Sequence, residues 1–236
     1  MILEVTNINT YYGTSHILFD VTLNVDQGEV VCLLGRNGVG KTTTMRSIMG
    51  LTHPRSGSVK FEGFELMGRP PYSRAKRGMG FVPDDRRIFP TLTVRDNLQL
   101  GAKKGARHDG LEEWTLDKVY ELFPALKNLD SRKGGTLSGG EQQMLTVART
   151  LMGNPILILM DEPAEGLSPL VVKTLSEQVL KLKELGQTIL ISEQNLPFAL
   201  AVADRAYVLE KGTIRYQGSI KELEADEEVR KKYLMI

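Results

Sequence analysis

The sequence is poor in the residues and runs that mark secreted or membrane-spanning chains. A single cysteine, Cys32, cannot form an intramolecular disulfide, so a reducing compartment is the simplest setting. The longest uninterrupted apolar run has six residues, Phe198 to Ala203, whereas a membrane span needs about 18–20. No Lys or Arg precedes Arg36, so the charged start of a secretory or transit peptide is not expected. We therefore do not expect the chain to cross a membrane by itself.

Net charge is nearly absent as well. Thirty Lys and Arg residues against 29 Asp and Glu residues leave a formal charge of +1, which argues against an overall electrostatic attraction to nucleic acid or anionic lipid. Internal repeats and low-complexity stretches are also missing. What is present is a composition suited to a packed core, with 41% hydrophobic residues. With 236 residues and roughly 150 per domain, we expect a single domain over 1–236 with a subsidiary lobe.

Apolar runs alternate with amphipathic stretches along the chain. Strands are expected at 30–34, 58–62, 80–83, 156–160 and 188–192, and helices at 41–51, from Gly140 onward and at 169–185. A hairpin is expected over 206–218 and short helices over 219–236. This order predicts an α/β fold with a mainly parallel sheet and antiparallel strands at its N-terminal side.

A helical lobe is expected as an insertion over about 93–150. Apolar residues in its middle are spaced by three and four, as on one face of a helix. They are Leu116, Val119, Tyr120 and Phe123. The loop 103–110, KKGARHDG, interrupts the lobe and is expected to be mobile.

The segment GRNGVGKTT at 35–43 matches the phosphate-binding pattern G-x-x-x-x-G-K-[ST]. Its glycines let backbone N–H groups converge on phosphate, and the start of the following helix adds its positive end. Lys41 can neutralise the β and γ phosphates, and the Thr42 hydroxyl can ligate Mg²⁺. The alternative is a plain Gly-rich turn, but this match follows a buried strand and opens a helix. The candidate nucleotide-binding residues are Gly35, Arg36, Asn37, Gly38, Val39, Gly40, Lys41, Thr42 and Thr43.

The segment ILILMDE at 156–162 is an apolar strand that ends in two carboxylates. Many buried strands end in Asp, so the pattern gains meaning only beside a phosphate-binding loop. In that setting Asp161 would hold Mg²⁺ through water, and Glu162 would polarise an attacking water. The alternative for Glu162 is that it merely caps a loop.

The segment LSGGEQQ at 137–143 fits two interpretations. Ser138 and Glu141 match the capping box of an ordinary helix start. Gly139 and Gly140 would also leave bare N–H groups at a helix N-terminus, which is an anion site. The segment resembles the LSGGQ sequence of the ATP-binding-cassette ATPases. The order of phosphate loop, helical lobe, LSGGEQQ and DE resembles that family over nearly the whole chain.

The resemblance implies the P-loop NTPase fold of the ABC type, with an aromatic residue upstream of the phosphate loop stacked on adenine. The matching position is Tyr12, before Gly13. Its neighbour Tyr11 is the other candidate, and one or both rings could instead pack in the N-terminal sheet.

Three positions depart from the family pattern. The family's Gln after the strand near GFVP is matched by Asp84, with Asp85 as a one-residue ambiguity. Its switch His falls on Gln194, and the Asp of its SALD-like loop falls on Ser168. The departures allow a regulatory module that binds ATP without turnover. A working hydrolase is favoured, because Asp84 can still ligate Mg²⁺ and the Gln194 amide can still donate to a γ-phosphate oxygen.

Four further segments resemble the ATP-binding subunits of bacterial branched-chain amino-acid importers, and relatives for urea or short amides look similar. They are PDDRRIFPTLTVRDNL, FPAL, DEPAEGLSP and ISEQN. The resemblance implies an ATP- and Mg²⁺-dependent motor at the cytoplasmic face of the inner membrane, bound peripherally. Its partners would be a second ATPase copy or paralogue that closes LSGGE over the nucleotide, two integral membrane permease subunits and, indirectly, a solute-binding protein.

One alternative class is a soluble cassette ATPase that acts on nucleic acid or ribosomes. Such proteins carry paired cassettes, zinc modules or coiled coils, and none is present here. The surface for membrane partners is expected on the helical lobe with the stretch 84–90. Four basic residues could face phospholipid, although a solvated face is the commoner explanation. They are Arg69, Arg74, Lys76 and Arg77.

Overall fold

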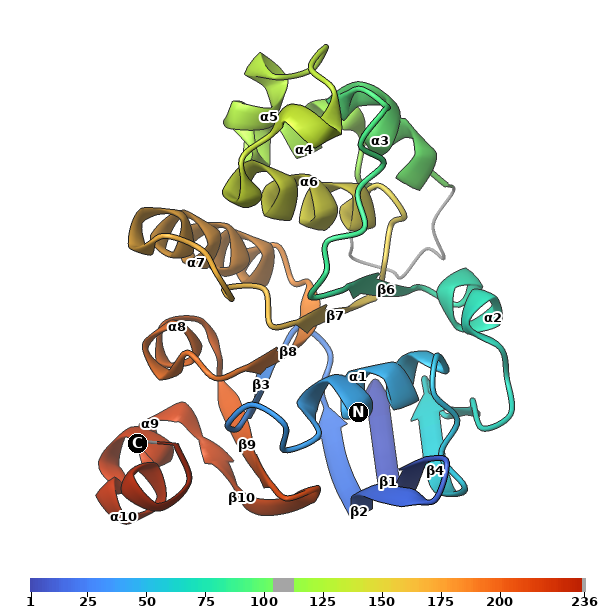
Figure 1. Cartoon of the computed structure of the whole chain (residues 1–236), viewed down its shortest axis with the longest axis vertical. Coiled ribbons are helices and arrows are strands. Elements are labelled where there is room, and N and C mark those ends of the chain that lie inside the picture. Colours follow the sequence, from blue (N-terminus) through green and yellow to red (C-terminus); the bar gives the residue numbers. More distant parts are fainter. Residues whose placement is uncertain (104–112, 235–236) are drawn as a thin grey trace.

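The computed structural model describes residues 1–103 and 113–234, which form two sheets and the helices around them (Figure 1). The strands are β1 (Leu3–Tyr12), β2 (Ser15–Val25), β3 (Val30–Leu34), β4 (Ser56–Phe61), β5 (Phe64–Glu65), β6 (Met79–Val82), β7 (Leu157–Asp161), β8 (Thr188–Glu193), β9 (Arg205–Glu210) and β10 (Thr213–Ser219). The helices are α1 (Lys41–Met49), α2 (Pro71–Lys76), α3 (Val94–Gly101), α4 (Leu116–Leu122), α5 (Pro124–Asn128), α6 (Gly139–Leu151), α7 (Pro169–Glu184), α8 (Leu196–Val202), α9 (Ile220–Ala225) and α10 (Glu227–Val229). Two further short elements are the 3-10 helix η1 (Gly134–Thr136) and the π-helix η2 (Arg230–Leu234).

The larger sheet has the order β10-β9-β3-β8-β7-β6 and is parallel except for β10. Every residue of β3, β7 and β8 is buried, because helices or the second sheet cover both faces. Alternate residues of β3 enter different cores. Val30, Cys32 and Leu34 join the core that contains α6, α7 and α8, whereas Val31 and Leu33 join the core of α1 and the N-terminal sheet.

The second sheet has the order β2-β1-β4-β5 and is antiparallel throughout. It lies on the α1 side of the larger sheet (Figure 1). The predicted α/β class, with a mainly parallel sheet and an antiparallel N-terminal part, is therefore confirmed.

The helices α3 to α6 gather beyond β6 and β7 (Figure 1), within the stretch assigned to the inserted lobe. Thr93 and Ser138 start α3 and α6 through capping boxes, so both helix starts are encoded locally. Of the loop 103–110, only Lys103 belongs to the described residues. That 93–150 forms a lobe distinct from the core remains a prediction.

Arg74 corrects one expectation about the basic residues near 70. It cannot face phospholipid, because its side chain is fully buried against the C-terminal end of α1. Its guanidinium donates hydrogen bonds to the carbonyls of Ser47 and Ile48 at 3.1 and 2.6 Å, and to Leu66 O at 2.8 Å. A cation at this end of α1 satisfies carbonyls that the helix itself leaves unpaired.

Candidate active site

The phosphate loop lies between the end of β3 and the start of α1. Gly38 and Gly40 have φ angles of 78° and 113°, which only glycine adopts without strain. Gly35 is required for a different reason, since a Cβ there would come within 2.5 Å of Leu209 O. The segment 35–43 therefore adopts the strand, turn and helix start that its pattern predicts.

Lys41 is held inside this loop by groups from two directions. Its Nζ donates to Gly35 O at 2.8 Å and to Arg36 O at 2.9 Å. It also forms an ion pair of 3.1 Å with Glu162 Oε1, in which the two side chains are only 2% and 10% exposed. The alternative role of Glu162 as a loop cap does not describe its side chain, which points at the phosphate-loop lysine.

Asp161 lies beside this pair at the end of β7 and is fully buried. Its Oδ1 accepts hydrogen bonds from Ser192 Oγ at 2.5 Å and from Thr42 Oγ1 at 3.2 Å. Its Oδ2 is buried without a hydrogen-bond partner. Burial raises the pKa of Asp161 to about 6, and the nearby charges of Asp84 and Glu162 act in the same direction.

These oxygens have the chemistry that Mg²⁺ prefers. A buried carboxylate oxygen without a partner and an adjacent threonine hydroxyl fit a hard cation. Within the described ranges, no group of three or more His, Cys, Asp or Glu side chains could hold a metal ion alone. Mg²⁺ is usually bound by one or two carboxylates together with substrate phosphates, so the arrangement agrees with a nucleotide-bound cation.

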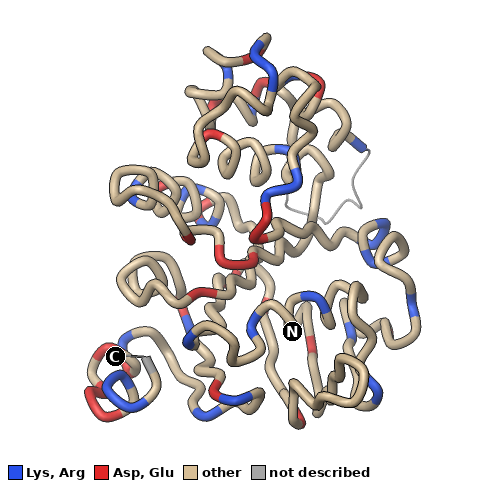
Figure 2. Tube along the Cα trace, in the orientation of Figure 1, with Lys and Arg blue, Asp and Glu red and all other residues tan. Residues whose placement is uncertain are grey.

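The two aspartates after β6 differ in their partners. Asp84 is close enough to Asp161 for its charge to raise the pKa of that group. Asp85 instead pairs with Arg87 at 2.8 Å. Figure 2 shows acidic positions meeting beyond the ends of β6 and β7, with a basic run next to them. The structure thus favours Asp84 over Asp85 as the residue facing the site.

Gln194 follows β8 and has an exposed side chain. Its backbone N–H donates to Glu193 Oε2 at 3.1 Å, which places it in the loop beside the carboxylates. Ser168 precedes α7 but its hydroxyl makes no capping hydrogen bond with that helix.

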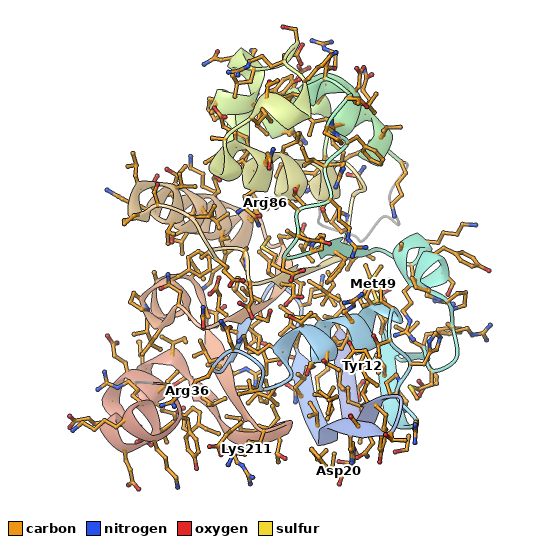
Figure 3. All side chains as sticks on the ribbon, in the orientation of Figure 1. Tyr12, Asp20, Arg36, Met49, Arg86 and Lys211 are labelled. Atoms are coloured by element: carbon orange, nitrogen blue, oxygen red, sulfur yellow. The ribbon has the colours of Figure 1, made fainter. Side chains whose placement is uncertain are left out.

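Tyr11 and Tyr12 have different environments. Tyr11 stacks on His16 with ring centroids 4.0 Å apart and carries the Arg55 guanidinium on its ring. Tyr12 is 47% exposed, and its hydroxyl lies 3.4 Å from Thr52 Oγ1, beyond the C-terminal end of α1 rather than at the phosphate loop. Tyr11 thus follows the packing alternative, and Tyr12 remains the ring available for stacking (Figure 3).

Ser138, Gly139 and Gly140 open α6, on the opposite side of β6 and β7 from α1 (Figure 1). The capping box is present, with Ser138 N donating to Glu141 Oε2 at 2.7 Å. Gly140 packs against Val171, where a Cβ would meet a methyl carbon at 2.8 Å. The LSGGE segment is therefore a helix start in which a side chain at either glycine would crowd a neighbouring side chain. The fold does not bring this segment to the phosphate loop of the same chain.

Three residues near the site escaped the sequence analysis. Ser192 Oγ donates a hydrogen bond to Asp161, Glu193 is a buried carboxylate, and the guanidinium of Arg86 lies against Gly139. For Ser192 and Glu193, the only indication in the sequence is that polar residues stand at the end of an apolar strand. For Arg86 the sequence gives less indication still, because Gly139, against which it lies, is distant in the sequence.

A glycine-rich phosphate loop before α1, faced by Asp161 at the end of β7 and by Glu162 directly after it, defines a P-loop ATPase. The chain belongs to the ABC transporter family, whose sequence profile matches residues 18–165. It is thus an ATPase of the ABC type. Within residues 1–103 and 113–234, no helix is long and apolar enough to span a membrane.

Several curated proteins are similar along their full length. The high-affinity branched-chain amino acid transport ATP-binding protein BraG of Pseudomonas aeruginosa is 41% identical over 98% of this chain and 99% of its own. The probable branched-chain amino acid transport ATP-binding protein LivF of Archaeoglobus fulgidus is 36% identical over 97% of each chain. The lipopolysaccharide export system ATP-binding protein LptB of Escherichia coli is 35% identical over 98% of this chain and 96% of its own.

Solved structures agree with this assignment. A nucleotide-free ATP-binding cassette from an ABC transporter superposes with a TM-score of 0.81 at 30% identity, over 97% of this chain and 96% of that one. A dimeric bacterial ABC transporter cassette superposes with a TM-score of 0.78 at 26% identity, over 92% of this chain and 98% of that one.

Proposed function

We propose that this chain is the ATP-hydrolysing motor subunit of a membrane importer for branched-chain amino acids. The observation that carries the motor role is the buried contact of Lys41 with Glu162, next to Asp161 and Thr42. The full-length similarity to BraG and LivF supports the solute class. The chain itself would not touch the amino acid.

In this proposal the phosphate loop binds the triphosphate and Glu162 accepts a proton from the attacking water. Thr42, Asp161 and Asp84 would hold Mg²⁺, which supplies charge neutralisation between the phosphates. Gln194 would donate its amide N–H to a γ-phosphate oxygen, and Tyr12 would stack on adenine. When nucleotide binds, Lys41 must leave Glu162 and contact a phosphate, and the Glu162 carboxylate is then free to accept the proton from water.

The proposed working unit contains two ATPase chains. Ser138, Gly139 and Gly140 lie apart from their own phosphate loop, so a second chain is needed to bring these groups to the nucleotide. The dimeric cassette of similar fold supports such an assembly. Two identical chains, or this chain with a paralogue, would both satisfy the chemistry.

The proposed location is the cytoplasmic face of the inner membrane, on two permease subunits served by a solute-binding protein. The stretch 84–90 with the adjoining α3 is the proposed contact surface. Phe89 and Leu100 expose apolar side chains there, which is consistent with a protein partner.

Export is the second candidate, because LptB is 35% identical over nearly the full length. A urea or amide importer is a further alternative. Similarity of the ATPase subunit distinguishes these only weakly, since the transported molecule meets other subunits.

Two measurements test the proposal. Steady-state phosphate release should depend on Mg²⁺ and disappear in Lys41→Ala, whereas a regulatory module would bind ATP without turnover. Affinity purification from membranes should recover integral permease subunits. Recovery of ribosomes or nucleic acid in their place would contradict the transporter role.

A further inference from the structure

Glu193 is a buried carboxylate at the centre of the active site that none of the roles above uses. It is the last residue of β8 and is only 1% exposed. Burial raises its pKa, and the charge of Glu162 contributes in the same direction. A carboxylate in such a place is costly unless its oxygens accept well-formed hydrogen bonds.

The hydrogen bonds of Glu193 come from two loops. Oε1 accepts from Ala164 N at 2.9 Å, in the loop that follows Glu162 and leads into α7. Oε2 accepts from Gln194 N and Asn195 N, both at 3.1 Å, in the loop that leads into α8. The side chain thus fixes the loop of Glu162 against the loop of Gln194.

Its backbone reaches a third segment. Glu193 O accepts from Gly35 N at 3.2 Å, at the first residue of the phosphate loop. One residue therefore contacts the segments that carry the proposed phosphate-binding lysine, the proposed base and the proposed γ-phosphate donor. Small changes in the relative position of these segments would alter the geometry in which water attacks the γ-phosphate.

We propose that Glu193 is a positioning residue that couples the loop after Glu162 to the loop of Gln194, and so sets the turnover rate. The inference rests on the proposed role of Gln194. A carboxylate is needed because both of its oxygens accept. An amide has one acceptor and one donor, so in Glu193→Gln one of the two loops loses its acceptor and faces an N–H group.

The first test compares turnover with nucleotide affinity in Glu193→Gln. We expect kcat to fall about 10- to 100-fold, since a displacement near 1 Å can have this effect, while the KM for ATP stays within about twofold. The matched control is Gln187→Met at the opposite end of β8. It removes hydrogen bonds of 3.1 and 3.0 Å to Pro155 O and Ile156 O, remote from the site, and should retain kcat.

The second test asks whether Glu193 acts through Gln194. In the double variant Glu193→Gln, Gln194→Ala, turnover should be close to that of Gln194→Ala alone. If Glu193→Gln does not fold, Glu193→Asp replaces it, because its shorter side chain cannot reach both loops. It should show the same loss of kcat.

Parental kcat in Glu193→Gln or Glu193→Asp would overturn the inference. So would a parallel loss of kcat and ATP affinity, or losses that multiply in the double variant. The parent is measured first, and a parent without turnover would contradict the proposed function and this inference with it. A parent with normal turnover confines any failure to the inference.

Discussion

Lys41 has two competing anionic partners, the carboxylate of Glu162 and the phosphates of a bound nucleotide. In the structure it contacts Glu162 at 3.1 Å, with both side chains almost fully buried. Separating a buried ion pair has an appreciable free-energy cost. We therefore expect this contact to weaken nucleotide binding and to keep Glu162 from acting on water until a phosphate replaces it.

Replacement of Glu162 by Gln should separate binding from hydrolysis. The amide cannot accept a proton from water, so turnover should stop. ATP affinity should rise at least several-fold, because the buried ion pair with Glu162 no longer competes with phosphate for Lys41. Calorimetric titration and phosphate release measure both effects, with Glu184→Gln, at an exposed position of α7, as the control. Normal turnover in Glu162→Gln would remove this residue from its role.

Gln194 should contribute to turnover rather than to binding. Gln194→Ala loses one hydrogen bond to a charged group, worth about 1.5–3 kcal/mol. If that bond strengthens in the transition state, turnover falls about 10- to 150-fold at saturating ATP. Gln194→His should retain substantial activity and gain a pH dependence, since His titrates near pH 6.5 and Gln does not. Alanine turnover within a factor of two of the parent would exclude Gln194 from the site.

Ionised Asp161 should lower the stability of the ligand-free protein, because its buried carboxylate has no cation to neutralise it. Its pKa is raised from 3.8 to about 6, so the folded protein binds this proton more tightly than the unfolded chain does. Stability should fall as the pH rises from about 4 to about 6, and Asp161→Asn should lack this fall. Denaturation of both proteins in EDTA over this range measures the difference, expected to reach about 1–3 kcal/mol. If stability changed with pH in the same way in both proteins, Asp161 would not be the source of the pH dependence.

At the scale of elements, α1 joins the phosphate loop at one end to a buried arginine at the other. Arg74 donates to Ser47 O and Ile48 O in the last turn of the helix, and burial lowers the pKa of Arg74 to about 10. Arg74→Met should lower the free energy of unfolding by about 3 kcal/mol, since it leaves several buried carbonyls without donors. Urea denaturation measures this effect, and Lys76→Met, at an exposed position of α2, is the control. Equal stability of the two variants would refute the capping role of Arg74.

The elements themselves were largely predictable. The apolar runs at 30–34 and 188–192 form β3 and β8, and Gly50, with a φ angle of 78°, ends α1 two residues before the expected end. The partners of buried polar residues were not predictable, as Arg74 shows. Its basic neighbours suggested a solvated face, but the carbonyls that bind it come from segments whose positions only the fold determines.

In the candidate site, too, local segments were predictable from the sequence and contacts between distant segments were not. Local sequence patterns predicted the phosphate loop and the two carboxylates as candidate site residues. The bonds of Ser192 and Glu193 join strands and loops across the sheet order β3-β8-β7, which the chain order does not reveal.

At the scale of the whole molecule, the phosphate loop, the carboxylates and Gln194 all lie at the C-terminal ends of the strands of the larger sheet. The LSGGE segment begins a helix on the opposite side of β6 and β7. Under the proposed function, this separation requires a second ATPase chain. In the proposed assembly, closure of the dimer around nucleotide would reach the membrane partners through α3 to α6 and the stretch 84–90. We therefore predict that binding of the solute changes the rate of ATP turnover.

The most direct test is phosphate release by the chain reconstituted in proteoliposomes with its permease subunits and solute-binding protein. We predict that leucine, isoleucine or valine, delivered by the binding protein, raises turnover above the solute-free rate. The same complex with Glu162→Gln should show no turnover with any solute. Stimulation by urea, an amide or lipopolysaccharide in place of these amino acids, or turnover that no solute changes, would contradict this prediction.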